Sequence, residues 1–162
     1  MIDNIKQNAK PNLKLTTIEA TAVAWAIASE GYIGLICCKY RPPNKPYQKR
    51  IQPVIEIANN KYEYLHILQN YIGGSISQKR TVWPTKPAWR LTICGNYDVY
   101  TLLKQIEKHL PIKKEQAKMI MEFCILRMDI STRKTVRNMP YQNRVWELVE
   151  IMRKLNKKGL RP

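Results

Sequence analysis

The sequence predicts an α+β domain in which one antiparallel sheet carries helices on a single face. Segments with helical and strand periodicity follow one another in the order helix, two strands, helix, two strands and further helices. The two strands of each pair are close enough in sequence to form a hairpin. In the clearest strand, polar residues alternate with apolar ones, which predicts one face on a core and the other on water or a polar ligand.

Length and composition fit one globular domain that binds a polyanion. The chain has 162 residues, of which 44% are hydrophobic, and this is enough for a sizeable core. It carries 28 Lys and Arg against 12 Asp and Glu, for a formal net charge of +16 at pH 7. Such an excess is typical of proteins that bind nucleic acid, with an anionic membrane surface as the second candidate.

Other features of the sequence exclude several classes. It contains no apolar stretch long enough to cross a bilayer, and its polar start lacks the apolar core of a secretion signal. We therefore expect a protein that stays inside the cell, is not secreted and has no membrane partner. The four cysteines form no Cys-x-x-Cys pair, so we expect buried thiols instead of a zinc site or a disulfide.

The first helix, predicted over residues 17–30, organises the rest of the chain. Thr16 and Glu19 are spaced as a capping box, and Gly31 suits the end of the helix. Many alanines favour close approach to another backbone. The helix ends on the acid Glu30, which the macrodipole disfavours at this end. Either Glu30 simply points into solvent at the end of a core helix, or a partner such as a bound cation compensates for it.

Four strands follow from the pattern of β-forming residues and turn signals. They are predicted over residues 32–40, 50–57, 75–81 and 88–94, with a turn at 58–60. In the second strand one face is polar and the other apolar. The polar face carries Arg50, Gln52 and Glu56 with Val54, and the apolar face carries Ile51, Pro53, Ile55 and Ile57.

The remaining helices follow from apolar residues at helical spacing. We predict them over residues 62–72, 99–110, 113–128 and 141–157, with Pro111 separating the second from the third. A pair of glycines ends the first of these helices. The helices supply the apolar faces that cover one side of the sheet.

The segment Val23–Gly31 resembles the signature nonapeptide of the LAGLIDADG homing endonucleases, in a form that ends Ala-Ser-Glu-Gly. It departs from that signature at Trp25, where the family usually has glycine, and at Ala28, where the family often has its first aspartate. Further resemblance covers the second helix with the third strand, the fourth strand and the start of the helix after the sheet. These segments are residues 65–77, 88–95 and 109–118, and together the resemblance spans roughly residues 16–126.

The resemblance implies an αββαββα fold with a curved, saddle-shaped sheet. It implies an intron-encoded homing endonuclease that cuts double-stranded DNA at a long pseudo-palindromic site with Mg²⁺, or another divalent cation such as Mn²⁺. Because the chain carries one signature, it implies a homodimer through the helix 17–30. It also places the protein with its DNA, in the cytoplasm of a prokaryote or an organelle matrix.

The resemblance also carries over residue roles. Glu30 would bind the metal with help from the Ser29 carbonyl, Lys113 would be the basic residue of the active site, and Asn59 the polar residue that positions water. The residues expected to contact DNA lie on the strands and their loops. They are Tyr40, Arg41, Lys49, Arg50, Gln52, Gln78, Lys79, Arg80, Lys86, Arg90 and Thr92.

The expected organisation is a polar N-terminal arm (1–15), an endonuclease core (16–128), and a basic linker and helix of the same domain (129–162). Two alternatives stay open. One is a binder on the same fold that does not cleave, either an RNA-splicing maturase that binds intron RNA or a DNA-binding regulator. The other is a structural basic protein such as a ribosomal component, which the basic tail favours.

Overall fold

The computed structural model describes residues 14–40, 48–79, 88–130 and 139–157, together with Pro43 and Pro46. Helices and strands follow one another in the predicted order. They are α1 (Thr17–Glu30), β1 (Gly31–Tyr40), β2 (Gln48–Asn59), α2 (Tyr62–Ile72), β3 (Ser75–Lys79), β4 (Ala88–Cys94), α3 (Asn96–Ile106), a short 3₁₀ helix η1 (Glu107–His109), α4 (Lys114–Ile130) and α5 (Met139–Lys157).

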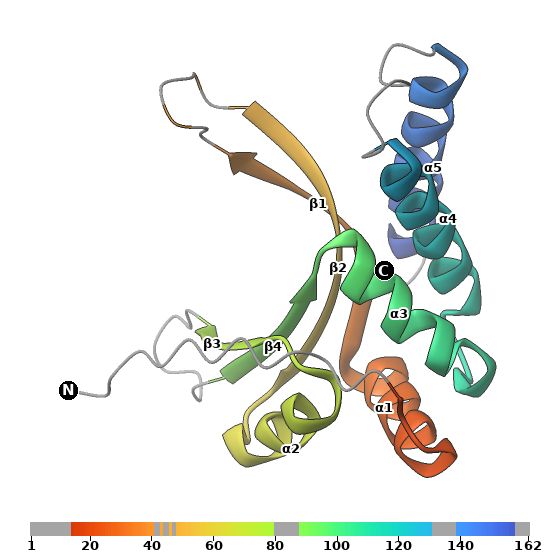
Figure 1. Ribbon diagram of the computed structural model, residues 1–162. Helices are drawn as coiled ribbons and strands as arrows, with labels where there is room; N and C mark the ends of the chain where they lie inside the picture. The colour runs from red at the N-terminus through yellow and green to blue at the C-terminus, as the bar shows by residue number, and fades with distance from the viewer. Residues whose placement is uncertain are drawn as a thin grey trace.

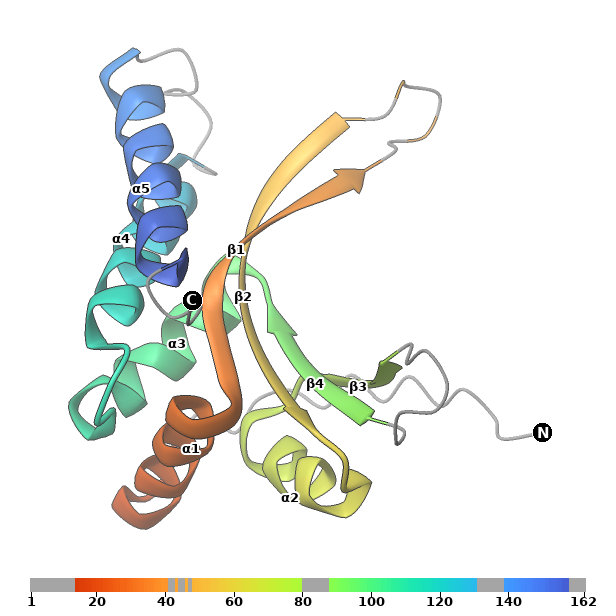
Figure 2. The ribbon, with the colours of Figure 1, turned by 180° about the vertical axis from the view of Figure 1, so that it is seen from behind.

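The four strands form one antiparallel sheet in the order β1-β2-β4-β3. The two hairpins are therefore joined through their second strands, β2 and β4, and β1 and β3 lie at the edges. The sheet is curved and the helices lie on one side of it (Figures 1 and 2). The predicted α+β class is confirmed.

Strand alternation gives the sheet two different faces. On the helix-covered face, Ile33, Ile55, Ile57, Leu91 and Ile93 are buried in the main core together with side chains from the helices. The opposite face, called the open face from here on, carries the alternate residues of each strand. This separation follows from the period of two in strands and confirms the alternation predicted for the second strand. Val54 is the exception, because it lies on the open face but is fully buried.

The β1–β2 hairpin diverges from α4 and α5 (Figures 1 and 2). On its helix side, the side chains change from the buried Ile33 to the half-buried Leu35 and the exposed Cys37. A second, smaller core lies at this part of β1, where Phe123 of α4 and Leu148 of α5 pack with Leu35. Beyond it, Lys39 of β1 and Arg50 of β2, which lie on opposite faces, are exposed.

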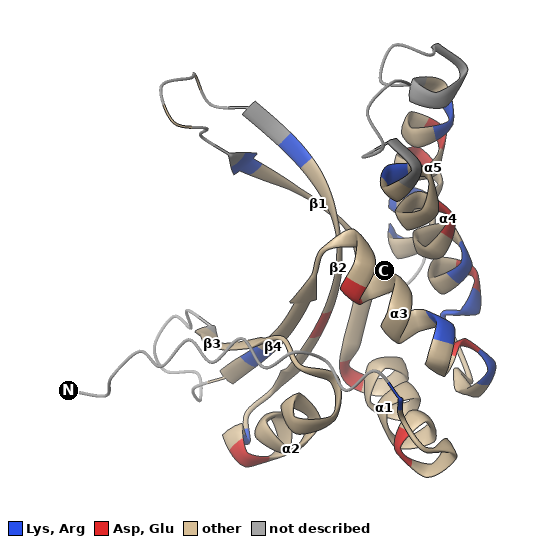
Figure 3. Ribbon diagram, in the orientation of Figure 1, with Lys and Arg blue, Asp and Glu red and all other residues tan. Residues whose placement is uncertain are grey.

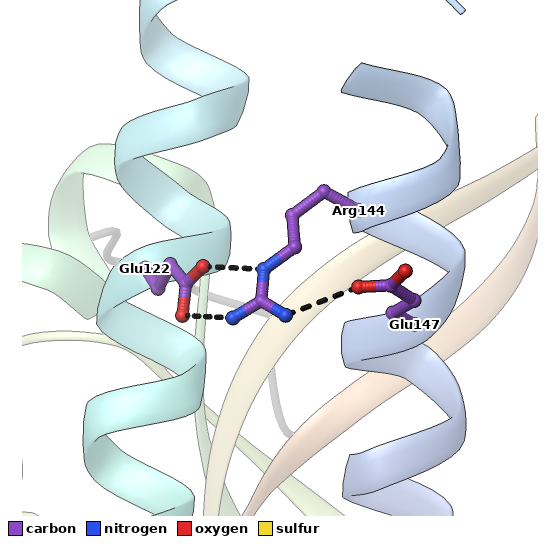
Figure 4. A network of polar contacts seen from close by, with 3 residues as sticks. All are labelled: Glu122, Arg144 and Glu147. Atoms are coloured by element: carbon purple, nitrogen blue, oxygen red, sulfur yellow. Dashed lines mark hydrogen bonds and ion pairs between the residues drawn. The ribbon is translucent and has the colours of Figure 1, made fainter. Parts of the chain in front are cut away.

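An ion-pair network joins α5 to α4. Arg144 donates two hydrogen bonds to Glu122, from Nε to Oε1 at 2.7 Å and from Nη2 to Oε2 at 3.0 Å, and one to Glu147 Oε2 at 3.1 Å (Figure 4). This fork matches the geometry of a carboxylate. It adds a polar contact to the apolar packing between α4 and α5.

Several boundaries and environments differ from the prediction. Residues 58 and 59 belong to β2 instead of a turn, because they pair with Arg90 and Trp89 of β4. The exposed Cys37 and Cys94 contradict the expectation of buried thiols, which holds for Cys124. The predicted end of the third strand, beyond residue 79, lies outside the described residues. None of the described helices is long and apolar enough to span a membrane.

Candidate active site at the end of α1

Helix α1 begins with the predicted capping box. Thr16 Oγ1 accepts a hydrogen bond from the Glu19 backbone N–H at 3.3 Å, and Glu19 Oε2 accepts one from the Thr16 N–H at 2.8 Å. One side of the helix, including Ala20, Ala24 and Ile27, is buried in the core. The cap and this buried side fix the position of the last turn.

The other side of α1 exposes apolar residues at helical spacing. Ile18 is 82% exposed and Trp25 is 58% exposed, and the small, exposed Ala22 lies between them. Ser29 continues this stripe toward the end of the helix, and its hydroxyl donates to the Trp25 carbonyl of its own helix at 2.9 Å. The stripe leads directly to Glu30 and is free in a single chain.

Glu30 is an exposed carboxylate held by one polar neighbour from β2. Asn59 Nδ2 donates to Glu30 Oε2 at 2.5 Å, and Asn59 Oδ1 accepts from the Lys61 backbone N–H at 2.8 Å. The second bond fixes which way the Asn59 amide points. The structure thus brings together two of the predicted site residues that are 29 positions apart in the sequence.

Lys113 lies under the same helix end and acts as its cap. Its Nζ donates to the carbonyls of Ile27 at 2.8 Å, Ala28 at 2.9 Å and Gly31 at 2.6 Å. An ammonium group has three donors, so all of them are used. α1 has no basic residue in its own last turn, and Lys113 supplies the positive charge that this end of the helix dipole favours. Burial lowers the pKa of Lys113.

The backbone of Lys113 is itself unusual. Its φ of 66° is in the left-handed region, which non-glycine residues rarely adopt. Such a conformation persists only where surrounding contacts determine it. Here the three carbonyl bonds and the start of α4 at the next residue determine it.

Gly31 is required at the junction of α1 and β1 because of space, not because of its φ. Its backbone is extended, with φ −96° and ψ 164°, which any residue can adopt. A Cβ at this position would lie 2.6 Å from the Ile27 carbonyl oxygen and 2.7 Å from the Ile27 Cα. Since those are backbone atoms, they cannot rotate away.

The oxygen ligands at this junction fit a magnesium ion. Mg²⁺ commonly takes one or two carboxylates and completes its shell with water and phosphate oxygens. Glu30 offers an exposed carboxylate, and the Ser29 carbonyl is not among the three that Lys113 occupies. Within the described residues no group of three or more His, Cys, Asp or Glu could hold a metal. Among the described side chains whose hydrogen bonds build this junction, Glu30 supplies the carboxylate.

The open face brings together most of the predicted DNA-contacting residues whose side chains are described. The register aligns Glu56 with Thr92, and Ala58 with Arg90 and Ser77. Arg50 and Gln52 continue the same face along β2. Charged groups of both signs lie on the sheet (Figure 3).

Gln78 is the exception among these residues. It pairs with Trp89, so strand alternation places it on the face opposite Arg90. Ser75 and Ser77 occupy the open-face positions of β3 instead, and the prediction missed them. The length of a strand and the turns beside it do not determine which of its two alternating sets of side chains lies on the open face. For β3, the register with β4 determines it.

The remaining predicted DNA-contacting residues are not fully described. The backbones of Tyr40, Lys49 and Lys79 lie in strands, but their side chains lie outside the description. Three more lie wholly outside the described residues. These are Arg41, Arg80 and Lys86.

Two open-face residues beside the candidate site were not predicted as site residues. Glu56 accepts a hydrogen bond from Arg90 Nη1 at 3.1 Å. Next to it in the register is Tyr32, whose Oη accepts from Asn156 Nδ2 of α5 at 3.2 Å. Burial raises the pKa of Tyr32, with a further contribution from the charge of Glu56. The alternation of the second strand predicted that Glu56 lies on the polar face. Nothing in the sequence indicated that Asn156 would contact Tyr32.

Comparison with solved structures gives the chain the fold of the LAGLIDADG homing endonucleases. An archaeal intron-encoded homing endonuclease, I-Vdi141I, complexed with DNA, matches with a TM-score of 0.67 and 18% identity over 89% of this chain and 87% of that one. The homing endonuclease I-CvuI, solved with an I-CreI target in the presence of Mg, matches with a TM-score of 0.66 and 14% identity over 85% and 82%.

The chain also matches about half of a longer homing endonuclease. The LAGLIDADG homing endonuclease I-GzeII, in complex with its DNA target, matches with a TM-score of 0.63 and 12% identity over 87% of this chain and 48% of that one. No family model matches this sequence, and a comparison with curated proteins finds no match either. The resemblance predicted from the signature is thus confirmed in the fold.

Proposed function

We propose that this protein is a site-specific, metal-dependent endonuclease that cuts double-stranded DNA as a homodimer. One observation carries the proposal. An exposed carboxylate, Glu30, stands at the end of a helix whose outer side is apolar and free, next to the face of the sheet that is turned away from the main core. The similar structures with DNA targets support it, since DNA is what those proteins were solved with.

DNA would lie against the open face. The net charge of +16 supplies sequence-independent attraction to phosphates. The β1–β2 hairpin has the shape of a two-stranded ribbon, which fits the major groove. On this face Arg50, Gln52 and Thr92 present donors and acceptors that suit base edges.

A second copy would pack against the exposed stripe of α1. Ile18 and Trp25 would be buried in that contact, and Ala22 between them allows the helices to approach. The bulk of Trp25 keeps two such helices further apart than glycine would. The contact would bring a second Glu30 to the same place, which supplies a second carboxylate.

Each residue of the junction would have one part in cleavage. Glu30, with the Ser29 carbonyl, would hold Mg²⁺ or Mn²⁺, which activates water and stabilises the leaving oxygen of a phosphodiester. Asn59 orients the Glu30 carboxylate and presents an amide to solvent water. Lys113 places a positive charge near the reacting phosphate while it caps α1.

A second function is favoured by one observation, the full use of the Lys113 ammonium by backbone carbonyls. A lysine that has no free donor cannot also donate to a phosphate without giving up a capping bond. This supports a binder on the same fold that does not cleave, either an RNA-splicing maturase acting on intron RNA or a DNA-binding regulator.

A cleavage-selection experiment distinguishes these functions. The purified chain is incubated with a randomised double-stranded DNA library, once with Mg²⁺ and once with a chelator, and cut ends are sequenced. The endonuclease predicts staggered breaks at one long, nearly two-fold site that occur only with metal. Enrichment of a bound sequence without any break, with Mg²⁺ or Mn²⁺, contradicts cleavage and favours the binder, which is then tested with intron RNA.

A further inference from the structure

The ion pair between Glu56 and Arg90 lies in the middle of the open face. The Arg90 Nη1 to Glu56 Oε1 distance is 3.1 Å, and the side chains are 36% and 24% exposed. Glu56 is an acid on the face that the proposed function turns toward a polyanion. A negative charge there weakens non-specific attraction to phosphates, so its presence calls for a specific role.

Residues of both neighbouring strands flank Glu56 on the open face. In the register its neighbours across the sheet are Tyr32 on β1 and Thr92 on β4. The Tyr32 ring lies over Gly34, where it would contact a Cβ at that position, and its Oη is held by Asn156. Glu56 therefore lies beside an anchored ring, and its half-buried carboxylate is the acceptor to which Arg90 is bound.

An arginine held in this way suits base recognition better than phosphate contact. A guanidinium group recognises guanine through two parallel hydrogen bonds to O6 and N7, which requires a fixed orientation. Holding the side chain in advance reduces the entropy lost on binding. A free arginine on the same face would instead pair with any phosphate within reach.

We propose that Glu56 is a positioning residue that orients Arg90 for reading one base pair and suppresses binding to non-target DNA. The inference rests on the proposed function and names residues that set its sequence preference. Arg90 pairs with Ala58 of β2, and the preceding residue, Ile57, pairs with Gly31 at the end of α1. Arg90 is therefore at the level of the α1–β1 junction along the strands. Two strand spacings, roughly 10 Å, separate β1 from β4, so the base pair lies near the centre of the target, not under the hairpin tip.

The test compares two charge-matched substitutions. Glu56→Gln removes the acid from the open face, and Glu122→Gln removes an acid that also pairs with an arginine but lies between α4 and α5 (Figure 4). Both raise the net charge by one. Wild type and both variants are selected on the same randomised duplex library, and their affinity for one mixed-sequence duplex is measured over a series of salt concentrations.

For Glu56→Gln we expect about a tenfold loss of discrimination at one central base-pair position of each half-site, with tighter binding to the mixed-sequence duplex. Glu122→Gln should keep the wild-type preference. Arg90→Lys should lose the same position, and the double variant should lose no more than either single one. A surface pair contributes little to stability, so the melting temperature should change by no more than about 4 °C.

Two results would overturn the inference, and they differ. Identical base preferences for Glu56→Gln and wild type reject the positioning role while the proposed function stands. If wild type selects no sequence and does not bind the mixed-sequence duplex, the proposed function fails first and the inference fails with it.

Discussion

The junction of α1 with β1 and the open face of the sheet are built in opposite ways. At the junction, Gly31 touches backbone atoms and Lys113 binds three backbone carbonyls. On the open face, the contacts are between the ends of side chains: Arg90 binds Glu56, and Asn156 binds Tyr32. Backbone contacts leave few ways to relax, whereas side chains can rotate. The difference indicates that the junction tolerates little change in position, whereas side chains on the open face can rearrange.

The largest effect is expected from Glu30→Gln. It removes the charge that would hold the metal and keeps an acceptor for Asn59, so cleavage should fall by at least about 10³-fold while salt-dependent DNA binding stays. The melting temperature should not fall, because an acid is disfavoured at this end of the helix. The measurement is single-turnover cleavage with Mg²⁺, and Glu63→Gln on α2 is the charge-matched control. Cleavage by the variant at the wild-type rate would remove Glu30 from the metal site.

Alanine substitutions at Gly31 and Gly34 compare how much stability each of the two regions loses when a Cβ is added. Gly31→Ala should destabilise the fold by about 3 kcal/mol, because its Cβ would meet the Ile27 backbone. Gly34→Ala should cost about 1 kcal/mol, because the Tyr32 ring can swing aside and lose its bond to Asn156. Chemical denaturation measures both. Equal losses would mean that the junction is no more rigid than the open face.

Lys113→Met tests the capping role. Removing the ammonium takes one donor from each of three carbonyls, of which Ile27 keeps the Gly31 N–H, and we expect a loss of about 2 kcal/mol in the free energy of unfolding. Lys114→Met, at an exposed neighbouring position, is the matched control and should change stability by less than about 0.5 kcal/mol. Cleavage by a folded Lys113→Met at the wild-type rate would restrict Lys113 to a structural role.

The smallest effect is expected from thiol labelling, which tests which face DNA covers. Burial raises the pKa of Cys124 to about 12, so this thiol should stay unreactive at pH 8 until the protein unfolds. Cys37 and Cys94 are exposed, and alternation places Cys94 on the open face. Bound DNA should slow alkylation of Cys94 several-fold more than that of Cys37. Measuring each rate in a variant that keeps one exposed cysteine checks this, and equal protection would contradict DNA binding on the open face.

Local patterns predicted much of the fold. The capping box at Thr16 and Glu19 is present as expected, and the alternation around Glu56 gave the correct faces of β2. The Gly-Gly pair ends α2 as the turn signals indicated. Local patterns were wrong where pairing with a distant strand decided the outcome. Residues 58 and 59 extend β2, and the face of Gln78 depends on the register with β4.

The sequence by itself determined the net positive charge, which follows from composition. It also determined the element order, the alternation of the second strand and the position of Glu30 at a helix end, because these depend on residues a few positions apart. Tertiary structure alone decided that Asn59 reaches Glu30, that Lys113 caps α1 across more than 80 positions, and that Arg90 is bound to Glu56. The physical reason is that local spacing sets secondary structure and strand faces, whereas a contact between distant side chains requires the sheet register and the packing of helices to be fixed first.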